Sequence, residues 1–134
     1  MSAASPDLRS KLSRAKGLGA AHHGVGHWWV QRVTAVALVP LTFWFISSLI
    51  AMVIATENGA AAQWFTSPCN AVLLCLMLVA MFWHAKLGFQ VVVEDYIKCP
   101  VAKYGLLLAN NFIAFAFAAI SILAVLKLHF AISL

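Results

Sequence analysis

Residues 33–56 read VTAVALVPLTFWFISSLIAMVIAT, a run of 24 residues without a charged side chain. A helix needs about 20 consecutive apolar residues to cross a hydrocarbon core roughly 30 Å thick. This stretch therefore predicts a transmembrane helix, which we place near residues 30–56. Pro40 lies inside it, and we expect a bend there, because a proline in a membrane helix more often kinks the helix than ends it.

Two further stretches, residues 71–93 and 104–126, are also long and apolar enough to cross a bilayer. We expect their helices near residues 69–95 and 104–128. Three crossings place the two termini on opposite sides of the membrane. The predicted fold class is therefore an all-α membrane protein with three transmembrane helices.

Composition supports this interpretation. Hydrophobic residues make up 63% of the 134 residues and charged residues 10%, against roughly 45–50% and about 25% in a soluble domain. The net charge of +5 is concentrated near the N-terminus, which favours a basic tail beside a membrane and no nucleic-acid partner. We divide the chain into an N-terminal segment, 1–29, and a transmembrane domain, 30–134. The cysteines lack the spacing of a disulfide framework or zinc site and are expected to serve packing: Cys69, Cys75 and Cys99.

The basic residues also predict the orientation. Seven of them precede the first helix or lie between the second and third: Arg9, Lys11, Arg14, Lys16, Arg32, Lys98 and Lys103. The loop 57–68 has none, and the C-terminal tail has only Lys127. Basic flanks stay in the cytoplasm. We therefore expect the N-terminus and the loop 94–103 to be cytoplasmic and the C-terminus periplasmic. The first apolar run begins too late and is too long for a cleaved signal peptide.

His84 is the most unusual residue of the second span. It lies about ten residues before the cytoplasmic end of that span, which places it near the bilayer centre. Ionisable residues at this depth are rare and face the protein interior or a polar pathway. A neutral imidazole can be an axial ligand of haem iron; the alternative is a hydrogen bond to a neighbouring helix. Gly88, one turn further on, would let a flat macrocycle or another helix approach closely.

The other histidines do not match this depth. His22, His23 and His27 are expected on the cytoplasmic side and His129 near the far surface. A haem with two histidine ligands would therefore take its second ligand from another chain. His23 and His27 could bind a metal if they were helical, but the glycines between them argue against a helix. A surface role or a contact with a cofactor carboxylate is favoured for His27.

Asp95 follows His84 by eleven residues, which leaves it about 20° off the same helical face and roughly 16 Å nearer the cytoplasm. Acidic residues such as Glu94 and Asp95 at a helix C-terminus oppose the helix dipole by roughly 0.3–1 kcal/mol each. Such a cost is expected where function overrides stability; the alternative is a solvated turn. Arg32 is expected at the level of Asp95, its alternative role being an interfacial anchor.

Two motifs carry a resemblance to a known family. Residues 22–35 read HHGVGHWWVQRVTA and residues 84–96 read HAKLGFQVVVEDY. Together they resemble the hydrophobic membrane anchor subunits, or D subunits, of succinate dehydrogenase, respiratory complex II. The second motif is the specific one, with a mid-membrane histidine followed eleven and twelve residues later by Asp-Tyr. The resemblance covers nearly the whole chain, including the three spans and their orientation.

The resemblance implies roles for particular residues. His84 would bind the iron of a haem b whose other histidine comes from the cytochrome b556 subunit. Arg32 and His27 would contact the haem propionates, for which a guanidinium fork is well shaped. Tyr96 would hydrogen-bond a ubiquinone carbonyl, and Asp95 beside it would orient that site. The three helices would pack with this cytochrome b556 subunit, the partner anchor subunit, into a haem-binding bundle.

The resemblance also implies a setting. FAD and iron–sulfur clusters would be held only by the flavoprotein and iron–sulfur subunits, docked on the cytoplasmic face, and no residue here would attack succinate. The chain would be a non-flavin subunit of succinate dehydrogenase in a bacterial inner membrane, or a mitochondrial one in a eukaryote. Two alternatives stay open: the anchor of a fumarate reductase, or a non-redox helical scaffold in which His84 and Lys86 form a polar helix contact.

Overall fold

The computed structural model describes residues 24–55 and 59–133. Within them the chain forms four helices: α2 (Gly24–Ile54), α3 (Ala60–Thr66), α4 (Pro68–Tyr96) and α5 (Pro100–Ser133). Three segments are long and apolar enough to cross a membrane, and they are Val25–Ile54, Pro68–Tyr96 and Pro100–Ile132. The predicted all-α class with three candidate membrane spans is confirmed.

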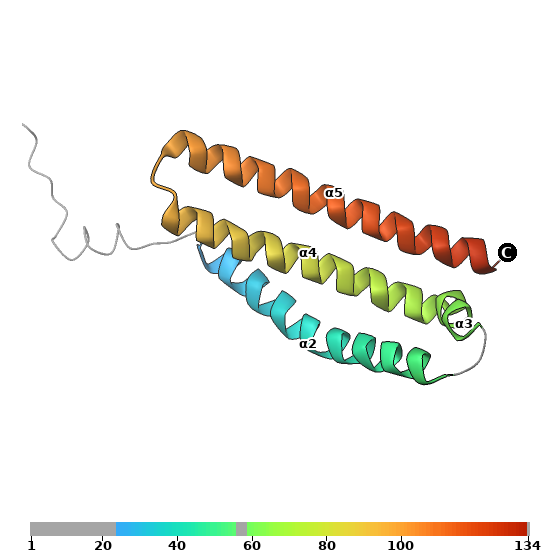
Figure 1. Cartoon of the computed structure of the whole chain (residues 1–134). Helices are drawn as coiled ribbons and strands as arrows, with labels where there is room; N and C mark the ends of the chain where they lie inside the picture. The colour runs from blue at the N-terminus through green and yellow to red at the C-terminus, as the bar shows by residue number, and fades with distance from the viewer. Residues whose placement is uncertain (1–23, 56–58, 134) are drawn as a thin grey trace, which may run out of the picture.

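The three long helices lie side by side with α4 in the middle, and α3 sits at the end opposite the α4–α5 turn (Figure 1). Helix α4 packs against both α2 and α5. Its central place explains why the buried hydrophobic residues of the described chain all belong to it: Ala71, Leu87 and Val93. Consecutive long helices run in opposite directions (Figure 1).

Helix α2 begins earlier than the sequence suggested. It starts at Gly24 rather than near residue 30, so His27 lies in its first turns. The expectation that the glycines before His27 prevent a helix was therefore wrong for Gly24 and Gly26. Pro40 lies inside the helix, which changes direction near its middle (Figure 1), as expected from a residue that has no backbone N–H to donate. Residues 1–23, including His22 and His23, are outside the described residues.

Helix α3 was not predicted, since residues 57–68 were expected to form a loop. Gly59 precedes it with a φ of 109°, a backbone conformation that glycine adopts without a steric penalty. The helix then packs against α4 and α5. Its Trp64 ring stacks on Trp44 of α2, with centroids 5.7 Å apart. His129 Nδ1 of α5 lies 2.7 Å from the backbone carbonyl oxygen of Phe65.

The turn between α4 and α5 is shorter than expected. It consists of residues 97–99 rather than 94–103, because α5 begins at Pro100. Proline suits the first turn of a helix, where its missing N–H is not needed. Lys103 in the next turn donates a hydrogen bond from Nζ to the backbone carbonyl of Glu94, at 3.1 Å. This bond satisfies one of the carbonyls that the end of α4 leaves unpaired.

Large apolar side chains cover the outer faces of the helices. Those most exposed on α2 and α5 include Val36, Phe43, Val53, Phe112, Ile120 and Leu123. An exposed apolar surface of this extent requires lipid or other protein around it. The chain is therefore a multi-pass membrane protein, and the outer faces of its long helices contact lipid or other protein.

Candidate functional site

His84 faces helix α2. Its Nδ1 lies 3.1 Å from the hydroxyl oxygen of Thr34. The Thr34 hydroxyl is also 2.8 Å from the carbonyl oxygen of Val30 and 3.0 Å from that of Gln31, both in the preceding turn of α2. The histidine is half-buried and bridges the two helices through a single hydrogen bond.

His84 also has the expected depth. It is the seventeenth of the 29 residues of α4, twelve residues before Tyr96. At 1.5 Å per residue this places it about 18 Å from the end of the helix. That distance is close to half the thickness of a hydrocarbon core plus its interface. The histidine is thus near the middle of the span.

Gly88, one turn from His84 in α4, faces helix α2. A Cβ added at Gly88 would lie 3.7 Å from Nε2 of Gln31, so Gly88 faces α2 across an ordinary van der Waals distance. The observed neighbour of Gly88 is therefore another helix, one of the two partners that the sequence left open. This approach and the Thr34–His84 bond define the register of two antiparallel helices.

That register corrects the expected position of Arg32. It places Arg32 opposite Lys86 and Leu87, eight or nine residues from the level of Asp95, which is roughly 13 Å. The two charged side chains form no ion pair in the described structure. Instead the Arg32 guanidinium carbon lies 4.9 Å from the ring centroid of Trp28, one turn earlier in α2. This cation–π contact directs the side chain toward the N-terminal end of α2.

A groove of about 700 Å³ opens between α2 and α4 on that side of His84. It is lined by four residues from each helix: His27, Trp28, Gln31, Arg32, Leu87, Gln90, Val91 and Glu94. The structure therefore brings together His27 and Arg32, which were predicted to act on the same group. Gln31 and Leu87 are about one turn from Thr34 and His84, so the groove leads toward the histidine.

The groove also contains an acidic residue, Glu94, for which the sequence predicted no function of its own. Glu94 lines the α4 wall, and its Oε1 accepts a hydrogen bond from Nε2 of Gln90 at 2.8 Å. The i, i+4 spacing of Gln90 and Glu94 could have predicted this bond. It could not have predicted that Glu94 shares a groove with two basic residues of α2.

Asp95 and Tyr96 lie apart from this groove, in the last turn of α4. Tyr96 is 79% exposed, and Asp95 is exposed as well. Neither side chain makes a hydrogen bond with any other part of the chain that the structure describes. The two are neighbours at the end of the helix, but the structure does not bring them together with Arg32 or His27. They can be reached from outside the chain.

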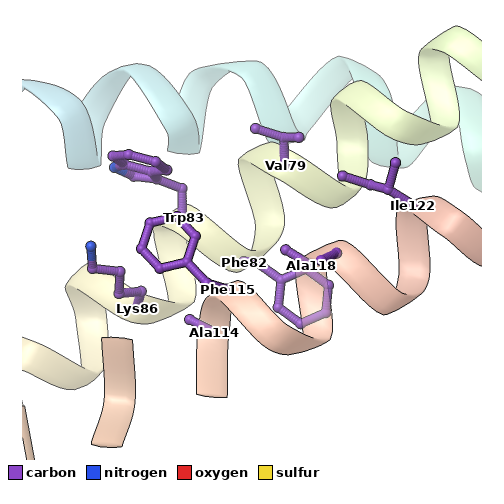
Figure 2. A pocket seen from close by; sticks show the side chains of 9 residues that line it. Val79, Phe82, Trp83, Lys86, Ala114, Phe115, Ala118 and Ile122 are labelled. Carbon is purple, nitrogen blue, oxygen red and sulfur yellow. The ribbon is translucent and has the colours of Figure 1, made fainter. Parts of the chain in front are cut away.

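Lys86 points to the other side of α4. Its Nζ lies 5.0 Å from the ring centroid of Trp83 and 5.1 Å from that of Phe115 in α5. The three side chains line an apolar cavity of about 260 Å³ between α4 and α5 (Figure 2). Nearby, Asn110 of α5 donates a hydrogen bond from Nδ2 to the backbone carbonyl of Lys86 at 3.0 Å. Lys86 and His84 thus contact different helices and not each other.

Within residues 24–55 and 59–133, no three His, Cys, Asp or Glu residues gather as a metal site would require. Cys69, Cys75 and Cys99 are free thiols. The pairing of His23 with His27 lies partly outside the described residues. A haem iron can take a single histidine from one chain, so the lack of such a group does not bear on His84.

Known proteins match most of the chain. The family model of the succinate dehydrogenase/fumarate reductase transmembrane subunit matches residues 6–125. A succinate dehydrogenase hydrophobic membrane anchor subunit from Rickettsia bellii (strain RML369-C) is 34% identical over 103 residues, which are 77% of this chain and 82% of that protein. The protein of the same name from Paracoccus denitrificans is 30% identical over 98 residues, 73% of this chain and 75% of its own length.

A succinate dehydrogenase membrane anchor subunit from Reclinomonas americana is 27% identical over 77 residues, which are 55% of this chain and 63% of that protein. No solved structure gives a significant match. The sequence matches confirm the resemblance carried by residues 22–35 and 84–96. The chain belongs to the family of succinate dehydrogenase and fumarate reductase transmembrane subunits, within which it is a hydrophobic membrane anchor subunit of succinate dehydrogenase.

Proposed function

We propose that this anchor subunit co-ligates a haem b through His84 and forms part of a ubiquinone-reduction site at Tyr96. Electrons released from succinate in partner subunits would reach the quinone pool there. The observation that carries the proposal is the state of the His84 ring. Its Nδ1 is held by Thr34, whereas its Nε2 has no hydrogen-bond partner among the described residues.

The residues around His84 fit a haem. A neutral imidazole nitrogen in an apolar surrounding is the usual protein ligand of a b-type haem iron. When bound, the haem accepts and returns one electron at a time. His84 would hold the iron from this side, and another histidine would come from the cytochrome b556 subunit. The exposed apolar faces of the long helices leave ample surface for that partner.

Arg32 and His27 would bind the haem propionates in the groove between α2 and α4. Two basic side chains there suit two carboxylates, and a guanidinium can bind a carboxylate with two parallel hydrogen bonds. The ring of Trp28 holds the Arg32 guanidinium at 4.9 Å, which reduces the entropy lost on binding. Glu94 on the opposite wall repels carboxylates. We therefore expect the α2 wall, and not the α4 wall, to bind them.

Tyr96 would hydrogen-bond a ubiquinone carbonyl. Reduction of ubiquinone to ubiquinol takes two electrons and two protons, so its head group needs a position at the membrane boundary where protons are available. Tyr96 ends α4 and is 79% exposed, so its phenol can donate a hydrogen bond to a molecule outside the chain. Asp95 is the adjacent residue and would orient the phenol or the quinone.

The partners would sit at the Tyr96 end of the helices. The iron–sulfur and flavoprotein subunits, which hold the clusters and the FAD, would dock on this face, with the N-terminus in the cytoplasm and the C-terminus in the periplasm of a bacterial inner membrane. The basic residues Lys98 and Lys103 next to Tyr96 support this orientation. Succinate itself would be oxidised in the flavoprotein.

One other function has specific support. The bond between His84 and Thr34 joins α4 to α2, and Lys86 of α4 lies over the ring of Phe115 in α5. A non-redox scaffold would need no more than such contacts. The same family also contains fumarate reductase subunits, in which the reaction runs in the opposite direction. The optical spectrum of the purified complex separates a scaffold, which would show no haem band, from the proposed function. The midpoint potentials of the haem and the quinone help to separate a fumarate reductase.

The test is the optical spectrum of the complex purified through a tag on this chain. We expect the wild type to show a low-spin b-type haem, and His84→Leu to convert it to high spin or to lose it. His129→Leu is the matched control, because it removes a histidine that bonds Phe65 at the other end of the bundle. An unchanged low-spin spectrum in His84→Leu would exclude His84 as the ligand.

A further inference from the structure

We propose that Thr34 is the positioning residue of His84: its hydroxyl oxygen accepts a hydrogen bond from Nδ1–H and so holds the ring in the tautomer that presents Nε2 as a ligand. The inference rests on the proposed haem function of His84. It adds a residue from a different helix to the ligand site, together with a defined direction for the hydrogen bond.

The direction of the bond follows from counting protons. A threonine hydroxyl has one proton to donate and two lone pairs to accept with. Thr34 Oγ1 lies 2.8 Å from the Val30 carbonyl oxygen and 3.0 Å from the Gln31 carbonyl oxygen. These two carbonyls can only accept, so the hydroxyl proton is used within α2, in the bond to the preceding turn that threonine often makes in membrane helices.

The oxygen of Thr34 is then an acceptor for His84. Nδ1 lies 3.1 Å away and must carry the proton of that bond. A neutral imidazole carries one N–H, so Nε2 keeps a free lone pair. In the opposite arrangement the hydroxyl would donate to Nδ1 and Nε2 would be protonated, which would prevent it from binding iron.

The hydroxyl is also well fixed in position. Thr34 is β-branched, which restricts its χ1 rotation in a helix, and its bond to the preceding turn selects one rotamer. Gln31 lies one turn before Thr34, and its Nε2 would be 3.7 Å from a Cβ built on Gly88. The two helices are therefore in contact beside the Thr34–His84 bond. The Nδ1 side of the His84 ring, and with it the tautomer, is thus held by α2.

A ligating histidine that donates its other N–H becomes more basic. More electron density at Nε2 favours ferric over ferrous iron and lowers the midpoint potential. A hydroxyl is an uncharged acceptor, so the effect is smaller than that of a carboxylate. We expect loss of the bond to shift the ferric–ferrous ratio about threefold toward ferrous iron, about 30 mV at 59 mV per tenfold change for one electron.

The experiment compares three variants in the intact complex, by redox titration of the haem and by electron paramagnetic resonance of its ferric form. Thr34→Val keeps the shape but removes the hydroxyl. Thr34→Ser keeps the hydroxyl. Thr42→Val is the matched control, because Thr42 is also half-buried in α2 but makes no side-chain hydrogen bond to other described residues.

We expect Thr34→Val to raise the midpoint potential and change the ferric spectrum, whereas Thr34→Ser and Thr42→Val resemble the wild type. If Thr34→Val loses the haem while Thr34→Ser retains it with the wild-type potential, the inference is supported as well. A Thr34→Val complex with the wild-type potential and spectrum overturns it, and so does loss of haem in both Thr34 variants. Absence of haem from the wild type would instead refute the proposed function.

Discussion

His84 has two ring nitrogens, and the structure gives them different surroundings. Nδ1 lies 3.1 Å from the Thr34 hydroxyl and contributes to helix packing, as any buried polar group must find a partner. Nε2 makes no hydrogen bond with the residues that the structure describes, so it stays available for the proposed haem iron. A packing role and a haem role therefore do not compete for this residue, because each uses its own nitrogen.

Tyr96→Phe tests the proposed quinone contact. The change removes only a hydroxyl, and one hydrogen bond together with poorer positioning of the quinone is worth about 1.4 kcal/mol, a factor of about ten in rate. We expect ubiquinone reduction to fall about tenfold or more. Succinate oxidation with an artificial acceptor at the flavoprotein should stay near the wild-type rate, since we propose that this reaction takes place in another subunit.

Tyr104→Phe is the matched control for this measurement. Tyr104 is the other tyrosine of the chain and is similarly exposed, at 73%, near the same end of the bundle. Its variant should reduce ubiquinone normally. Asp95→Asn should act in the same direction as Tyr96→Phe, with complex abundance measured alongside. Normal ubiquinone reduction by both Tyr96→Phe and Asp95→Asn in a fully assembled complex would mean that the pair is an ordinary helix end.

The depth of His84 in the membrane could be predicted from sequence, because it follows from counting residues along one span. The partner Thr34 could not, because it depends on the register between two helices. The same applies to Arg32, whose level was predicted about 13 Å too close to that of Asp95. Its contact with Trp28 is local, at i, i+4, and recognising that α2 starts at Gly24 would have been enough to predict it.

At the scale of the elements, α3 depends on Gly59. Its φ of 109° is unfavourable for residues with a Cβ. We expect Gly59→Ala to destabilise the complex by about 1 kcal/mol or more, seen as a lower midpoint of thermal unfolding in detergent. Gly105→Ala is the counterpart, since Gly105 lies inside α5 and a new Cβ there would have no atom from outside its own helical turns within 4 Å among the described residues.

Gly105→Ala should leave stability unchanged or raise it by about 0.5–1 kcal/mol, because alanine favours a helix interior. Equal destabilisation by the two substitutions would show that Gly59 has no special backbone role.

The long helices were predictable because about 20 apolar residues have few other structures available in a membrane. The short α3 was not, because its position depends on distant residues, Trp44 stacked on Trp64 and His129 bonded to Phe65.

At the scale of the whole molecule, the three long helices form a single layer with α4 in the middle (Figure 1). Such a layer leaves most apolar side chains of α2 and α5 facing outward. The sequence predicted three spans but not this order of packing, because each helix is apolar on nearly every side and shows no preferred face. The arrangement leaves room for the proposed partner anchor subunit and for lipid.

The orientation of this layer is testable with cysteine labelling. In a background without the native cysteines, Ala61→Cys in α3 should react with an impermeant thiol reagent applied from the periplasmic side. A variant that retains only Cys99, in the turn after α4, should react only after the cytoplasmic face is opened. The basic flanks are the reason, since they favour the cytoplasm. The reverse labelling pattern would invert the topology and move Tyr96 to the periplasmic side.

The central claim is that this chain anchors a succinate-oxidising complex and passes its electrons to ubiquinone. The most direct measurement is to purify the intact complex through a tag on this chain, identify its subunits, and assay succinate-driven ubiquinone reduction together with the haem spectrum. We predict co-purification of a flavoprotein, an iron–sulfur subunit and a second anchor subunit, with low-spin b-type haem and ubiquinone reduction. A tagged chain that purifies without these subunits, without haem and without the activity would contradict the account.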